Sequence, residues 1–204
     1  VWCHQDLKEQ FNRPEIGNLF HHHKLLLSYN PSNANFIDAT IGYIDASLFV
    51  QTTKGVTFPT WQMSSVVGVI HASVLNALKG KIVCDTDFDY YLSSLAKLCM
   101  PLGLLCYSEP LLLKQGESIV RPKASMYLLF RFVKQHYKTQ WVFLLLLNLV
   151  LYERKFPVLP FLFSFFYKNR KNSTINLDSI MVQSSRKVID KVTVDVIIPT
   201  IGRS

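Results

Sequence analysis

The sequence is poor in cysteine, glycine and acidic residues. Its 204 residues include 4 Cys, 8 Gly and 14 Asp+Glu, against 22 Lys+Arg. So little glycine excludes a collagen-like fibre, and four cysteines without CxxC spacing exclude a disulfide mini-protein, a zinc ribbon and a thioredoxin-type redox motif. No apolar run reaches the roughly 20 residues that a membrane-spanning helix requires.

Apolar and aromatic residues are plentiful, at 49% and 13%, which is too much for a disordered tail. The charge is uneven, because residues 114–204 hold 15 Lys+Arg and 5 Asp+Glu whereas residues 1–113 hold 7 and 9. In the basic half the charges flank apolar runs and are not interleaved with aromatic residues as in a nucleic-acid platform. We therefore expect a membrane surface as partner, and no nucleic acid.

The patterns of apolar residues predict a mixture of strands and helices. Residues 36–50 predict a strand with Gly42 in its middle, and residues 61–78 predict an apolar segment that is helical toward its end, closing at Gly80. The spacing of apolar residues predicts a helix over 92–99, ended by Pro101 and Gly103. A short buried strand follows at 104–107.

The basic half begins with a predicted amphipathic helix over 126–137, whose polar face includes Arg131 and Gln135. Two uncharged runs of twelve residues follow, 141–152 and 156–167. Two interpretations stay open for these runs. They form either a monotopic hairpin or interfacial helix on anionic lipid, or a buried pair of core helices. The run His21–His23 is interpreted as a solvated loop or helix end, so no metal site is predicted.

The last ten residues, DVIIPTIGRS, form a β-branched run that ends in Pro-Thr and a turn with Gly and Arg. A buried strand that ends in such a turn is how a parallel α/β sheet presents a ligand-facing loop. The segment resembles the opening strand of the family 2 glycosyltransferases of GT-A fold, a Rossmann-like α/β fold. The resemblance implies that Pro199, Thr200 and Arg203 contact the nucleotide of the sugar donor. Ile201 and Gly202 stand where the family usually has Tyr-Asn.

Three acids occupy alternate positions, Asp85, Asp87 and Asp89. Capping of the following helix explains one or two of them and leaves the third unexplained. Residues 86–112 resemble the late catalytic segment of the same family, in which an acidic pair opens a helix and a Gly closes it. The resemblance implies that Asp87 is the general base, with Asp89 next and Asp85 third, as an acceptor-binding residue. Serine stands at 93 and 94, where the family's helix carries an Arg.

Residues 36–49 resemble the strand and loop that hold the acceptor in this family, which implies acceptor contacts for Gly42 and Asp45. A plain core strand is the alternative. The matched segments come in an order opposite to that of one complete domain. We therefore expect the C-terminal part of one transferase domain at residues 1–115 and a helical extension at 116–171. A linker at 172–191 and the first strand of a second domain at 192–204 would follow. A circular permutation is the other explanation.

Together these features predict an α/β chain with a partial GT-A domain, apolar helices and an isolated strand. The resemblance implies inverting transfer of a sugar from a nucleotide-sugar donor to a hydroxyl of a glycan or lipid-linked acceptor, in polysaccharide or surface-glycan synthesis. It also implies a divalent ion, Mg or Mn, with ligands outside this chain, and a peripheral location at the cytoplasmic face of the plasma membrane. The isolated chain is expected to be inactive. The alternative function is a non-catalytic module that binds a membrane surface.

Overall fold

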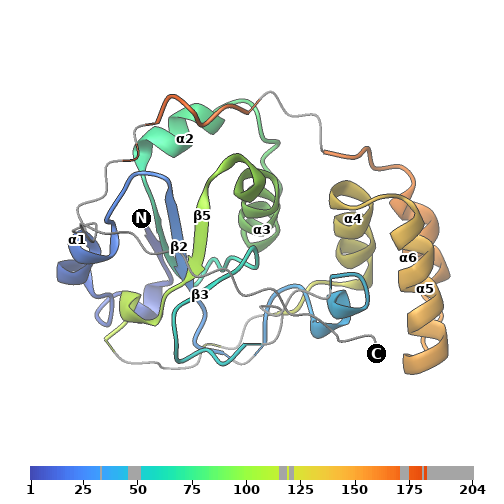
Figure 1. The fold of residues 1–204 in the computed structure, drawn as a ribbon. Coiled ribbons are helices and arrows are strands. Elements are labelled where there is room, and N and C mark those ends of the chain that lie inside the picture. Colours follow the sequence, from blue (N-terminus) through green and yellow to red (C-terminus); the bar gives the residue numbers. More distant parts are fainter. Residues whose placement is uncertain are drawn as a thin grey trace, which may run out of the picture.

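The computed structural model describes residues 1–32, 34–45, 52–114, 119, 122–170, 175–180 and 182. Within them the chain is α/β, with one mixed sheet covered by helices (Figure 1). The expected final strand at 192–204, with Pro199, Thr200 and Arg203, lies outside the described residues, as does most of the expected linker.

The sheet has five strands in the order β1-β4-β2-β5-β3. Its central strands β2 and β5 are parallel, whereas β4 runs antiparallel to β1 and β2, and β3 runs antiparallel to β5. Parallel neighbours end at the same edge, so the carboxyl ends of β2 and β5 lie together. The strands span β1 Trp2–Cys3, β2 Leu25–Tyr29, β3 Phe58–Pro59, β4 Val67–Ile70 and β5 Leu105–Ser108.

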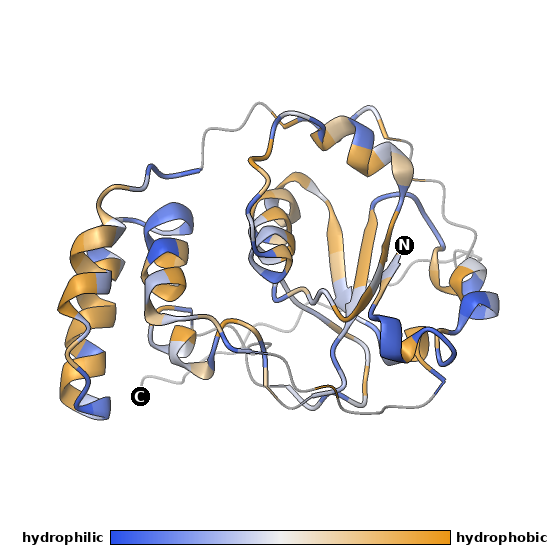
Figure 2. Cartoon of the chain, turned by 180° about the vertical axis from the view of Figure 1, so that it is seen from behind, coloured by the Kyte–Doolittle hydropathy of each residue, from blue (hydrophilic) through white to orange (hydrophobic). Residues whose placement is uncertain are grey.

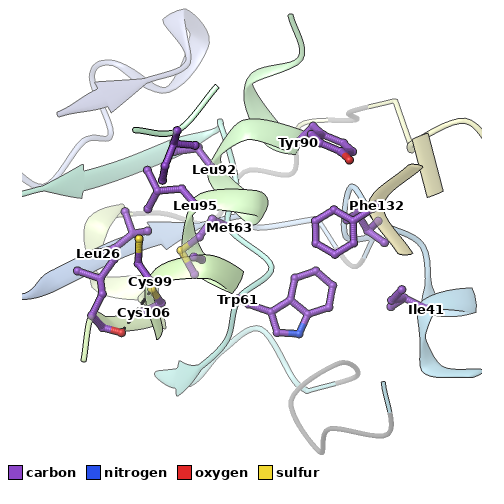
Figure 3. Close-up of a cluster of buried hydrophobic side chains, with 14 of the residues drawn as sticks. Leu26, Ile41, Trp61, Met63, Tyr90, Leu92, Leu95, Cys99, Cys106 and Phe132 are labelled. Atoms are coloured by element: carbon purple, nitrogen blue, oxygen red, sulfur yellow. Dashed lines mark hydrogen bonds between the residues drawn. The ribbon is translucent and has the colours of Figure 1, made fainter. Parts of the chain in front are cut away.

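Strand β2 is buried along its whole length, as expected for a strand covered on both faces. Alternate residues of β2 pack into two different hydrophobic cores. Leu26 packs with helix α3, Phe88–Cys99, and with helices of the basic half, whereas Leu25 and Leu27 pack with the N-terminal segments. Figure 3 shows the first of these cores, in which the ring of Trp61 lies beside that of Phe132 with centroids 5.1 Å apart. The sheet therefore lies between two hydrophobic cores and contributes side chains to both.

The helix predicted over 92–99 is confirmed as α3, which begins four residues earlier, at Phe88. Asp87 caps its first turn, and a 3-10 turn, Met100–Leu102, leads to Gly103 at φ 88°. Only glycine adopts this left-handed conformation at little cost, which explains why the helix stops there. The strand expected next is confirmed as β5. Helix α2, Ala72–Leu78, likewise confirms the expected helix before Gly80, with β4 preceding it.

The strand expected over 36–50 is wrong in its described part. Residues Ala39–Tyr43, Gly42 included, form a 3-10 helix, and residues 46–50 lie outside the description. The side chain of Asp38 accepts a hydrogen bond from the Ala39 N–H at 2.7 Å, which caps this turn. The β-branched residues of this segment favour a strand by local propensity. The cap and the burial of Ile41 in the core outweigh that propensity.

The basic half forms three helices beside the sheet, α4 Met126–His136, α5 Gln140–Glu153 and α6 Val158–Ser164 (Figure 1). The expected helix over 126–137 is confirmed as α4, but its placement of Gln135 on a solvated face is wrong. Gln135 is buried because its side-chain oxygen accepts a hydrogen bond from the Tyr90 hydroxyl at 2.7 Å. Helix α4 packs against α3, α5 and α6.

Helices α5 and α6 cover the core with one side only. Val142, Leu145 and Leu149 are fully buried, whereas Phe143, Leu147 and many residues of α6 are exposed. The interpretation as a fully buried pair is therefore wrong, and both helices present apolar residues to the outside (Figure 2). None of the described helices combines the length and the apolar character needed to cross a bilayer.

We predict that Gly68→Ala destabilises the protein by about 1–3 kcal/mol, as overpacking does. A β-carbon at Gly68 would meet the indole of Trp2 and would lie 2.7 Å from the carbonyl oxygen of Leu27, closer than real contacts allow. Urea unfolding measures the change. Gly17→Ala is the control, because nothing lies within 4 Å of a β-carbon there. Equal stability of the two variants would contradict the packing of Trp2 across β4.

Candidate functional site

A small polar pocket lies at the edge where β2 and β5 end. Ser28 and Asn30 come from the end of β2, Ser108 is the last residue of β5, and Asp89 and Ser93 come from α3. The crevice outside the carboxyl ends of parallel strands is the usual ligand site of α/β sheets. Its free volume is about 10 Å³, which admits one group the size of a water molecule. The remaining lining residues are Asn35, Phe36, Ile37, Lys54, Gln62, Met63 and Ser64.

Asp89 is the buried acid of this pocket, with 5% of its surface exposed. Its two carboxylate oxygens accept hydrogen bonds from Ser65, one from the backbone N–H at 2.6 Å and one from the hydroxyl at 2.7 Å. Donors of this kind stabilise a carboxylate and fix its orientation.

The loop that carries Ser65 is fastened to the strand beneath it. The N–H of Ser64 donates to the hydroxyl oxygen of Ser28 at 3.1 Å, and the N–H of Val66 donates to the hydroxyl oxygen of Ser64 at 3.1 Å. All three residues are buried, so these bonds are shielded from water. The donors to Asp89 therefore sit on a fixed part of the fold.

Two further polar side chains, Gln62 and Lys54, line the pocket. The amide oxygen and nitrogen of Gln62 are both buried, and neither makes a hydrogen bond to any part of the chain that the structure describes. Lys54 donates to the side-chain oxygen of Asn35, and its ammonium lies 6.0 Å from the ring centroid of Phe58. Burial lowers the pKa of Lys54 to about 8.

Asp87, the residue that the resemblance favours as the base, caps helix α3. Its side chain accepts a hydrogen bond from the Tyr90 N–H at 2.9 Å, and it is absent from the pocket lining. The helix begins between Asp87 and Asp89, so the two side chains point to different surroundings. Capping therefore accounts for Asp87, and burial in the pocket singles out Asp89.

Asp85 is bound by two arginines and is only 3% exposed. Arg170, which follows α6, contacts both of its oxygens at 3.0 Å, and Arg131 of α4 donates to one of them. Arg170 also donates to the hydroxyl oxygen of Ser94 at 2.8 Å. An arginine from the helical extension thus reaches one of the two serines that stand where the glycosyltransferase helix carries an Arg.

Asp45 lies away from the pocket, in a network of its own. Its Oδ2 accepts hydrogen bonds from Lys97 and the Tyr137 hydroxyl at 2.7 Å and from the indole N–H of Trp61 at 3.1 Å. Burial and this bond to Asp45 raise the pKa of Tyr137. Gly42 lies apart again, beside a surface hollow of about 370 Å³ next to Tyr43 and Glu153. Asp45 and Gly42 are thus not brought to Asp89.

The acids do not form a metal site. Asp85 and Asp87 match an Asp-x-Asp string, but two guanidinium groups hold the first and a helix N-terminus holds the second. Across the described ranges, no three His, Cys, Asp or Glu side chains are placed to share an ion. The donor set therefore does not fit a divalent ion, and no step of the proposed chemistry is derived from one.

Comparison with known proteins gives no relative: no family model, no curated protein and no solved structure matches this chain.

The sequence did not indicate Lys54 and Gln62 of the pocket lining, nor Ser65, which donates hydrogen bonds to Asp89. Their approach to Asp89 depends on the sheet, which joins segments distant in sequence. One signal was available: polar residues follow the apolar run of β2, at Ser28 and Asn30, and Ser108 ends β5. Polar residues at the ends of two parallel strands predict a shared ligand edge.

We predict that Asp85→Asn lowers the free energy of unfolding by about 3–5 kcal/mol, because it leaves two buried guanidinium groups without their counter-ion. Asp6→Asn, at an exposed position, is the control and is expected to change stability by less than about 1 kcal/mol. Chemical denaturation of both variants measures the difference. Similar small effects in the two variants would show that Asp85 does not hold the extension to the sheet.

Proposed function

We propose that the chain contributes the acceptor side of a glycosyltransferase site, which transfers a sugar from a nucleotide-sugar donor to a hydroxyl group with inversion. The observation that carries the proposal is the buried carboxylate of Asp89 in a pocket at the carboxyl ends of β2 and β5. The resemblance to the family 2 glycosyltransferases of GT-A fold over residues 86–112 and 195–204 supports it. The mixed α/β sheet is compatible with such a fold.

Asp89 is the proposed general base. An acceptor hydroxyl that enters the pocket would donate its hydrogen bond to the carboxylate and lose its proton there as its oxygen attacks the anomeric carbon of the donor. The bond from that carbon to the nucleoside diphosphate breaks at the same time, and the diphosphate leaves with the bonding electron pair. Two hydrogen bonds from Ser65, one to each oxygen, fix the orientation of the carboxylate, and Asp89 lines the pocket. The small volume admits the reacting hydroxyl and leaves the rest of the acceptor outside.

We predict that Asp89→Asn lowers transfer activity by about 10²-fold or more, the usual contribution of a general base. Asp87→Asn is the matched control, and we expect it to stay within a few-fold of wild type because Asn also caps helices well. The assay uses the full-length gene product with a panel of nucleotide sugars and hydroxyl acceptors. Loss of activity in the Asp87 variant with full activity in the Asp89 variant would assign the base to Asp87.

A membrane surface is the second proposed partner, and the exposed side of α5 and α6 supports it. Phe156 and Phe166 are 72% and 82% exposed, beside the exposed basic residues Arg154, Lys155 and Lys168. Aromatic and aliphatic side chains next to basic ones are typical of helices that lie in the interface of an anionic bilayer. We propose a peripheral position of the chain on such a surface. The other exposed apolar residues of this face are Phe143, Leu147, Leu151, Tyr152, Val158, Leu159, Leu162, Phe163, Phe165 and Tyr167.

We predict that the protein floats with vesicles that contain anionic lipid, and that the double variant Leu159→Ser/Phe166→Ser binds them about tenfold or more weakly, since each large apolar side chain contributes about 1.5–3 kcal/mol when buried. Leu75→Ser on α2 is the control, because Leu75 is exposed but lies outside this face. Flotation with phosphatidylcholine alone tests the role of charge. Equal binding of the double variant and the control would show that α5 and α6 do not form the membrane contact.

A further inference from the structure

Lys54 differs from the other cations that the fold buries. Lys97 is paired with Asp45, and Arg131 and Arg170 are paired with Asp85. Among the described residues no carboxylate lies within ion-pair distance of Lys54, which contacts the amide of Asn35 and the ring of Phe58. A cation withdrawn from water without a counter-ion is costly, so such an arrangement is typical of a binding site.

The position of Lys54 in the fold supports a role of its unpaired charge in ligand binding. Lys54 lines the same pocket as Asp89, at the ligand edge of the sheet. Gln62 lines it as well, and both of its buried amide atoms lack a partner in the described part of the chain. A buried polar group without a partner costs free energy until a ligand or a water completes it. The pocket therefore offers an ammonium, an amide donor and an amide acceptor to whatever enters.

We propose that the acceptor is an acidic saccharide, a sugar that carries a carboxylate or phosphate group. Lys54, which is partly exposed, pairs with the anionic group, and Gln62 binds the one hydroxyl that the pocket admits. This inference rests on the proposed function, since it takes the pocket to be the acceptor site. Carboxylate and phosphate share the feature that Lys54 recognises, which is an anionic oxygen.

The charge of Asp89 does not oppose this assignment. Its carboxylate is already bound by the N–H and hydroxyl of Ser65. The anionic group of the ligand is drawn to Lys54, whereas Asp89 requires a neutral hydroxyl. A ligand with both groups matches both residues, and a neutral sugar leaves Lys54 without a counter-ion.

The test compares binding of three probes, methyl glucoside, methyl glucuronide and glucose 6-phosphate, by calorimetry or ligand-detected NMR on the whole chain. We expect the two anionic sugars to bind about tenfold or more tightly than methyl glucoside, as one charge-assisted hydrogen bond allows. Lys54→Met, which keeps an unbranched side chain, should remove this preference. Lys79→Met is the control, because Lys79 is exposed on the far side of α2, and it should keep the preference.

Each other outcome decides the question. Equal affinity for charged and neutral sugars in the wild type would overturn the acidic class and leave the proposed transferase intact. A preference that survives Lys54→Met would place the anion elsewhere. Inorganic phosphate that binds as tightly as glucose 6-phosphate would reveal a bare anion site and overturn the saccharide. Failure of all three sugars to bind would also overturn the inference, while the comparison of Asp89→Asn with Asp87→Asn decides the transferase separately.

Discussion

The ion pairs of Asp85 fix the structure around the candidate site. One carboxylate joins the segment before α3 to α4 through Arg131 and to the segment after α6 through Arg170. Asp85 lies two residues before the cap of α3, so its ion pairs hold the chain just before that helix. The start of α3 in turn directs Asp89 into the pocket. The helical extension is therefore part of the framework of the site and not an appendage.

The three alternating acids illustrate how a fold separates charges that the sequence places together. In an extended chain Asp85, Asp87 and Asp89 would share one side and repel one another. Because α3 begins between the last two, each meets different donors: guanidinium groups, a backbone N–H and Ser65. Of the three, the acid held by Ser65 is the one that lines the pocket at the ends of β2 and β5. The chemistry of the cluster follows from this division, which spacing alone does not reveal.

Local signals predicted the elements that are locally determined. The cap and the apolar spacing predicted α3, Gly103 predicted its end, and the amphipathic pattern predicted α4. The short run Leu25–Leu27 gave no sign that it forms the central strand, because strand pairing depends on partners distant in sequence. The strand expected over 36–50 is wrong for the same reason. Gln62 and Lys54 come to the same pocket as Asp89 only through the tertiary fold, so the sequence, which placed Asp89 second to Asp87, did not reveal the pocket around it.

The central claim is that the pocket of Asp89 receives the hydroxyl of a saccharide. The most direct measurement is a crystal structure of the chain soaked with methyl glucuronide and, separately, with methyl glucoside. The account predicts a sugar hydroxyl oxygen at about 2.6–3.2 Å from the carboxylate of Asp89, hydrogen-bond reach for a base. A sugar bound at Asp87 or in the hollow beside Gly42, with the pocket of Asp89 empty, would contradict it.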